Sequence, residues 1–120
     1  MPDFNGVLNG NGYSISGLTH SLFDYVENTE IKNVVLSGTS ILDTTNEYTG
    51  GLIGLSQKDN SIFNSSTNVE ISGNTVGGLV GMTYNTTIIS DCYSTGWVNN
   101  TAIGNSRSGG LVGWVSNVTK

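Results

Sequence analysis

The chain has 120 residues and a net charge of −5, and its four Lys and Arg residues are scattered along the sequence. Because no basic patch is present to neutralise phosphates, we expect neither nucleic acid nor an anionic membrane surface as a partner. No apolar run approaches the roughly 18 residues of a membrane span, so we expect no membrane-spanning segment. Val, Ile and Thr are frequent between Gly and Asn residues, which favours a β-rich fold with many corners.

The first twenty residues are interpreted as part of a repeat. The segment GYSISG at 12–17 aligns with NVEISG at 68–73, which places Ser14 in one column with Glu70. Because 68–73 forms the second half of a repeat, residues 1–20 are expected to form a partial coil.

Three glycine-rich pentapeptides mark the repeats that follow. GGLIG begins at Gly50, and GGLVG begins at Gly77 and again at Gly109, which are 27 and 32 residues apart. A degenerate earlier copy, SLFDY, begins at Ser21, and the longer second spacing comes from an extended loop at 99–108. The predicted coils are therefore 21–49, 50–76 and 77–108, followed by a partial coil at 109–120, within a single solenoid domain that covers 1–120.

Alignment on the glycines produces columns of similar residues beyond the pentapeptides. One column is Leu throughout, a second is Ile throughout, and a third, two residues after the second, is Asn or Asp. The columns are Leu22, Leu52, Leu79 and Leu111; Ile31, Ile62 and Ile89; and Asn33, Asn64 and Asp91.

This period of about 27–32 residues predicts an all-β, right-handed parallel β-solenoid (β-helix) of about four coils. Successive coils would stack at about 4.8 Å, so the Leu and Ile columns become core stacks. The Asx column becomes a corner ladder of side-chain amides. The glycines are assigned to structural corners, where the backbone needs a positive φ and coils approach closely. They are Gly50, Gly51, Gly54, Gly77, Gly78, Gly81, Gly109, Gly110 and Gly113.

The glycine pentapeptides do not have the pattern of a phosphate-binding loop, since none is followed by Lys and Ser or Thr. His20 is the only histidine and has no partner at metal-ligand spacing, so it is interpreted as a solvated turn residue. Cys92 shares a column with Val34 and Ser65, which predicts a buried, inert thiol. No cofactor and no metal are expected.

The acidic residues occupy mostly different columns, so no pair for acid–base catalysis emerges. Asp24, Glu27 and Glu30 form a local acidic stretch that is interpreted as a solvated loop, with weak Ca²⁺ binding as the alternative.

Trp97 is the candidate ligand-binding residue. It aligns with Glu70 and Ser14, which are residues of an outward-facing type, so its indole is expected on the surface. Exposed aromatic rings stack on sugars, and Tyr93 lies nearby in the sequence. The alternative is that Trp97 packs beneath the loop at 99–108.

The copies of GGLVG, together with IISDCYSTGWV before the last copy and LNGNGYSISGL near the N-terminus, resemble the GLUG repeat family. The Gly-Leu-any-Gly core is present at 51–54, 78–81 and 110–113, whereas 21–24 lacks both glycines. The resemblance implies a repeat of bacterial surface adhesins or of the non-catalytic regions of immunoglobulin A-specific metallopeptidases. It implies an extracellular or cell-surface location and no catalytic residue.

These features predict a non-enzymatic module that acts as an adhesive or spacer scaffold, with a host protein or glycan as its partner. The alternative is a structural subunit that polymerises end to end along the solenoid axis into an extracellular filament, with itself as the partner. A third hypothesis, a polysaccharide-cleaving enzyme, would depend on Asp91 or Glu70.

Overall fold

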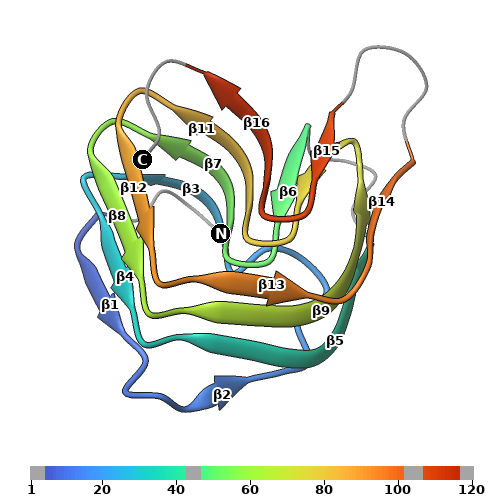
Figure 1. The fold of residues 1–120 in the computed structure, drawn as a ribbon, viewed down its shortest axis with the longest axis horizontal. Coiled ribbons are helices and arrows are strands. Elements are labelled where there is room, and N and C mark those ends of the chain that lie inside the picture. The colour runs from blue at the N-terminus through green and yellow to red at the C-terminus, as the bar shows by residue number, and fades with distance from the viewer. Residues whose placement is uncertain (1–4, 43–46, 102–106, 117–120) are drawn as a thin grey trace.

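Four parallel sheets surround one core in the computed structural model, which describes residues 5–42, 47–101 and 107–116. All the strand pairs in these ranges are parallel. The described residues form no helix, and therefore none long and apolar enough to cross a membrane. The chain visits the sheets in turn, making about three turns (Figure 1). This arrangement confirms the predicted parallel β-solenoid.

Each sheet collects equivalent strands from successive coils. Sheet A contains β3 (Phe23–Glu27), β7 (Ile53–Gln57), β11 (Val80–Tyr84) and β16 (Val112–Ser116). Sheet B contains β1 (Val7–Asn9), β4 (Glu30–Lys32), β8 (Asn60–Phe63) and β12 (Thr87–Ser90). Sheet C contains β2 (Ser14–Ile15), β5 (Val35–Leu42), β9 (Ser66–Gly73), β13 (Tyr93–Thr95) and β14 (Val98–Asn100). Sheet D contains β6 (Tyr48–Gly50), β10 (Thr75–Gly77) and β15 (Ser108–Gly109).

The register between strands places equivalent residues of successive coils side by side. In sheet B, Ile31 pairs with Ile62, and Ile62 pairs with Ile89. The backbone N–H of Leu52 donates to the carbonyl of Leu79 at 2.9 Å, and both leucine side chains are fully buried. Each buried Leu or Ile contributes about 1.5–3 kcal/mol through removal of apolar surface from water.

The glycine pentapeptides form turns that project into the solenoid. In Figure 1 the strands of sheet D run toward β9 and β13, reverse, and continue as the strands of sheet A. A Cβ on Gly78 would lie 2.1 Å from Ser94 Oγ and 2.3 Å from the carbonyl oxygen of Gly110. A Cβ on Gly51 would lie 2.8 Å from Thr67 Cγ2. The turns therefore pack against the opposite wall, and only glycine leaves enough space there.

One part of the predicted reason for these glycines was wrong. Positive φ angles occur at Gly6, Gly12, Gly17 and Gly96, and at none of the nine pentapeptide glycines. The close approach of neighbouring backbones, the other part of the prediction, is what the structure shows at Gly50, where a Cβ would lie 2.7 Å from the backbone nitrogen of Gly81.

The alignment of the N-terminal segment was also wrong. Ser14 pairs with Val35, and Val35 pairs with Ser66, so Ser14 does not share a column with Glu70. Four residues, 10–13, connect β1 to β2, where two residues connect β4 to β5. Backbone hydrogen bonds across this longer corner set the register, and local sequence similarity does not.

Candidate binding surface

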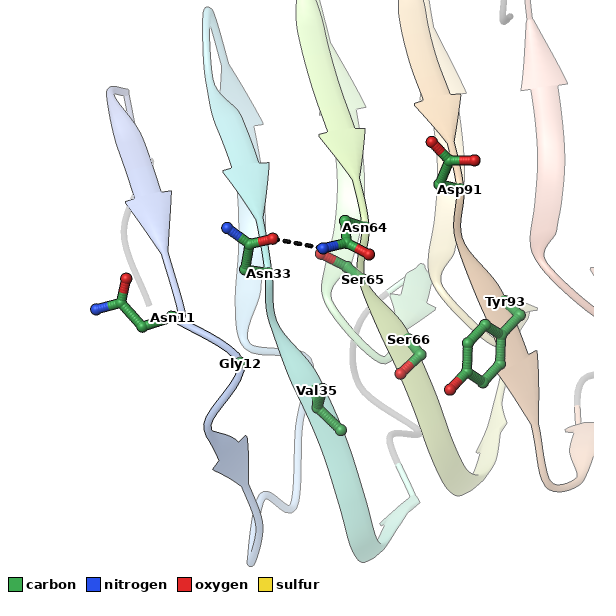
Figure 2. Close-up of a pocket in the computed structure, with 9 residues that line it drawn as sticks. All are labelled: Asn11, Gly12, Asn33, Val35, Asn64, Ser65, Ser66, Asp91 and Tyr93. Atoms are coloured by element: carbon green, nitrogen blue, oxygen red, sulfur yellow. Dashed lines mark hydrogen bonds between the residues drawn. The ribbon is translucent and has the colours of Figure 1, made fainter.

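A row of Asx side chains follows the corner between sheets B and C (Figure 2). Asn33, Asn64 and Asp91 have φ angles of 58°, 50° and 54°, a left-handed conformation that Asn and Asp tolerate better than most residues. Asn64 Nδ2 donates to Asn33 Oδ1 at 2.6 Å, and Asn33 Nδ2 donates to Asn9 Oδ1 at 3.0 Å. We call these four residues the Asx row. Its continuation to Asn9 was missed, since Asn9 lies outside the aligned column.

Asp91 occupies the last position of the Asx row and breaks its hydrogen-bond pattern. In the two preceding steps the later residue donates an amide hydrogen to the earlier one. An ionised carboxylate has no hydrogen to donate. Asp91 instead accepts a long hydrogen bond of 3.4 Å from Ser90 Oγ, and no group among the described residues donates to Asn64 Oδ1. The open end of the row therefore presents oxygen acceptors.

A groove of about 460 Å³ lies beside the Asx row. Its other side is formed by the first residues of successive strands of sheet C, as Figure 2 shows for Val35, Ser66 and Tyr93. No Lys, Arg or His is among the residues that line it, and Asp91 is the one charged residue among them. The groove is therefore polar, weakly acidic and open along several coils.

Tyr93 and Trp97, the two predicted ligand-binding residues, are both exposed, at 63% and 78%. Tyr93 lines the groove beside the Asx row. Trp97 lines a separate hollow of about 330 Å³ that also contains Glu70 and Val98. The structure thus places the two rings on the surface of the same coil but in different depressions. Residues 102–106 of the adjoining loop lie outside the described residues.

Cys92 is half-buried, although the equivalent residues Val34 and Ser65 are buried. Its Sγ is 3.2 Å from the carbonyl oxygen of Ser90 and 3.5 Å from that of Ile62. Burial raises the pKa of the Cys92 thiol, and the nearby Asp91 carboxylate raises it further, against the opposing effect of backbone hydrogen bonds. A raised pKa keeps the thiol protonated and slow to react.

The histidine and the acidic residues considered as metal ligands do not gather at one site. His20 is exposed, and its Nδ1 donates to the carbonyl of Ser21 at 2.6 Å. Within the acidic stretch, Glu27 pairs with Lys58 at 3.2 Å and Glu30 pairs with Lys32 at 3.5 Å. Among the described residues, no three His, Cys, Asp or Glu side chains gather as a metal site would require.

A second left-handed corner, between sheets A and B, was missed in the sequence. Asn28, Lys58 and Asn85 have φ angles of 50°, 65° and 67° at equivalent positions. The signal was the recurrence of Asn-Thr at 28–29 and 85–86, which Lys58 interrupts in the intervening coil. This corner provides a matched reference for the corner that carries the Asx row.

The in-register strands and inward glycine turns define a parallel β-solenoid whose repeat is one coil. The family model of the GLUG motif matches residues 72–99, which run from the end of β9 to β14 and so cover one coil. The match confirms the resemblance to the GLUG repeat family. The GLUG motif is a non-catalytic repeat found in surface and secreted proteins. No curated protein and no solved structure matches the chain.

Proposed function

We propose that the chain is a non-enzymatic repeat module of a bacterial cell-surface or secreted protein, acting as a spacer scaffold with an adhesive face. The observation that carries this proposal is the in-register stacking of equivalent residues, such as Leu55, Met82 and Trp114 in sheet A. Each coil packs on its neighbours alone, so the number of coils sets the length of the scaffold, at about 4.8 Å per coil. The occurrence of GLUG motifs in surface and secreted proteins supports the location.

Insertion of extra coils tests the scaffold role. Three additional copies of residues 50–76 placed after Val76 should lengthen the particle by about 14 Å and raise its melting temperature. Small-angle X-ray scattering and circular dichroism measure the two effects. An unchanged longest dimension, or loss of the β-sheet signal, would contradict the proposal.

Antibody labelling tests the location. Antibodies raised against the purified chain should label intact, unpermeabilised cells of the source organism or bind the protein in its culture medium. Detection only after cell lysis would contradict a surface or secreted role.

Trp97 is the residue on which the adhesive face was predicted. Its side chain is 78% exposed, and a large aromatic ring in water provides a flat apolar surface for a host protein or glycan. A glycan-array screen of the wild type against Trp97→Ala tests this face. Equal binding by the two chains, or binding by neither, would remove Trp97 as a site.

End-to-end polymerisation is a second candidate function, and the order of strands favours it. Among the described strands, sheets A and D finish with β16 and β15 at one end of the stack, one level beyond β12 and β13. At the other end, sheets B and C begin with β1 and β2, one level before β3. The two ends are therefore complementary half-coils, and exposed strand edges pair readily with further strands.

Electron microscopy and light scattering of the purified chain distinguish the two candidates, since filaments favour polymerisation and a stable monomer excludes it. Ile88→Lys places a charge on β12, an edge strand of sheet B, and should suppress filaments. The control Tyr84→Lys alters β11, which is paired on both sides, and should leave them intact.

A further inference from the structure

We propose that the groove beside the Asx row binds a neutral oligosaccharide that lies along the solenoid axis. The inference rests on the proposed adhesive role and assigns a binding site for that role at a place separate from Trp97. The site spans the corner between sheets B and C, where side chains from four successive levels of the stack line one groove.

The Asx row supplies hydrogen-bonding groups of the kind that sugar hydroxyls require. A hydroxyl both donates and accepts, and a primary amide offers two donor hydrogens together with an acceptor oxygen. Asn33 and Asn64 each use one amide hydrogen within the row, which leaves the second for a ligand. Asn64 Oδ1 and the Asp91 carboxylate add acceptors at the open end. The groove therefore offers amide donors at Asn33 and Asn64 and free acceptors at its Asp91 end.

Tyr93 supplies an apolar face beside these polar groups. Its ring is 63% exposed, and in Figure 2 it lies next to Ser66 at the edge of the groove. Neither the Tyr93 hydroxyl nor the Ser66 hydroxyl makes a hydrogen bond with another described residue. A ring that is flat and apolar on its face and polar at its tip matches the two sides of a pyranose, with its C–H face and its equatorial hydroxyls.

The charge of the groove selects against acidic ligands. None of its lining residues carries a positive charge, and the Asp91 carboxylate would repel a sialic acid, a sulfate or a phosphate. An acidic sugar would lose its hydration in this groove without gaining an ion pair. The same argument disfavours nucleic acid.

The groove is held ready for a ligand before binding. Asn33 and Asn64 are fixed by hydrogen bonds to their neighbours, so little side-chain entropy remains to be lost. Four levels of a parallel stack span about 14 Å, a distance that accommodates a short linear oligosaccharide. The repeat thus places one Asx side chain per coil, Asn33, Asn64 and Asp91, at a regular interval along the groove.

An array of immobilised neutral and sialylated glycans, screened with matched variants, tests the proposal. The wild type should bind neutral glycans, and Tyr93→Ala should weaken this binding by about tenfold, as expected for loss of an aromatic anchor. Asn64→Gly removes the amide while keeping a residue that tolerates a positive φ, and it should weaken binding by a similar factor. Asn85→Gly makes the same change at the other corner and should bind as the wild type does.

The outcomes separate this inference from the scaffold proposal. Binding to sialylated glycans alone, binding to none, or equal binding by the wild type and both groove variants would overturn the groove assignment. Loss of binding in Trp97→Ala with full binding in Tyr93→Ala would assign the adhesive role to Trp97 instead. Circular dichroism of each variant tests whether the solenoid is intact. A lost β-sheet signal would concern the scaffold proposal, and it would not count as evidence on the groove.

Discussion

Apolar residues fill equivalent columns in the middle of the stack and in its last strands, β12 and β16, but only those in the middle are fully buried. Leu79 and Ile62 have no exposed surface, whereas Leu111 and Ile89, their counterparts toward the C-terminal end, are half-buried. Met82 is 7% exposed, and Trp114 in the same column is half-buried although Arg107 lies 3.9 Å from its ring centroid. The comparison shows that a neighbouring coil on each side, rather than the residue itself, completes the burial.

The largest expected difference in the free energy of unfolding is between two Leu→Ala variants, one in the middle of the stack and one at its C-terminal end. Leu79→Ala should destabilise the chain by about 3 kcal/mol, because it leaves a cavity between two coils. Leu111→Ala should cost about 1 kcal/mol, since part of that side chain already contacts solvent. Urea unfolding followed by circular dichroism measures both. Equal losses of unfolding free energy in the two variants would contradict the conclusion that a second neighbouring coil completes the burial.

A second comparison concerns the glycine turns. Gly78→Ala should destabilise by about 2 kcal/mol, because the new methyl group would meet backbone and the Ser94 side chain. At Gly110, the equivalent position of the last turn, a Cβ would meet nothing within 4 Å. Gly110→Ala should therefore change the free energy of unfolding by less than about 0.5 kcal/mol. A large loss at Gly110 would indicate a backbone requirement that the contacts do not reveal.

A smaller effect on stability is expected in the Asx row. Asp91→Asn should stabilise the chain by about 1 kcal/mol, because the new amide can donate to Asn64 Oδ1 and continue the hydrogen-bond pattern. Asp59→Asn removes the same charge from an exposed residue outside the row and serves as the control. If both variants shift the melting temperature equally, the effect is one of net charge and not of the row.

The smallest effect is kinetic and concerns Cys92. Because burial raises its thiol pKa, less thiolate is present at pH 8, and iodoacetamide should react more slowly with the folded chain than with the urea-unfolded chain. Ser65, its counterpart in the preceding coil, is 3% exposed, so a chain with Ser65→Cys and Cys92→Ser should react more slowly still. The ratio of the rates measures how much protection one further coil provides.

Much of the fold was predictable because the repeat constrains it. Equivalent residues must occupy equivalent environments when coils stack, so aligned Ile and Leu residues indicate shared neighbours. The prediction failed at 12–17, where a longer corner shifts the register without changing the local sequence similarity. Register depends on hydrogen bonds between coils, and the sequence of a short segment does not show which residues of the next coil it will pair with.

The surface was less predictable than the core. Sequence alone identified the outward type of Trp97 and the Asx column, but it placed Tyr93 and Trp97 together. The structure separates them, since Tyr93 faces a groove assembled from four levels of the stack and Trp97 faces another hollow. A groove that draws two or three residues from each level of the stack leaves no contiguous motif.

The sequence by itself determined the parallel solenoid, its period and the composition of its columns, because each of these follows from residues that recur along the chain. Only the tertiary structure decided that the glycine turns point inward against β9 and β13, and that the Asx row extends to Asn9. The reason is physical: recurrence specifies which residues stack, whereas the path of the coil in cross-section depends on how opposite walls pack against one another.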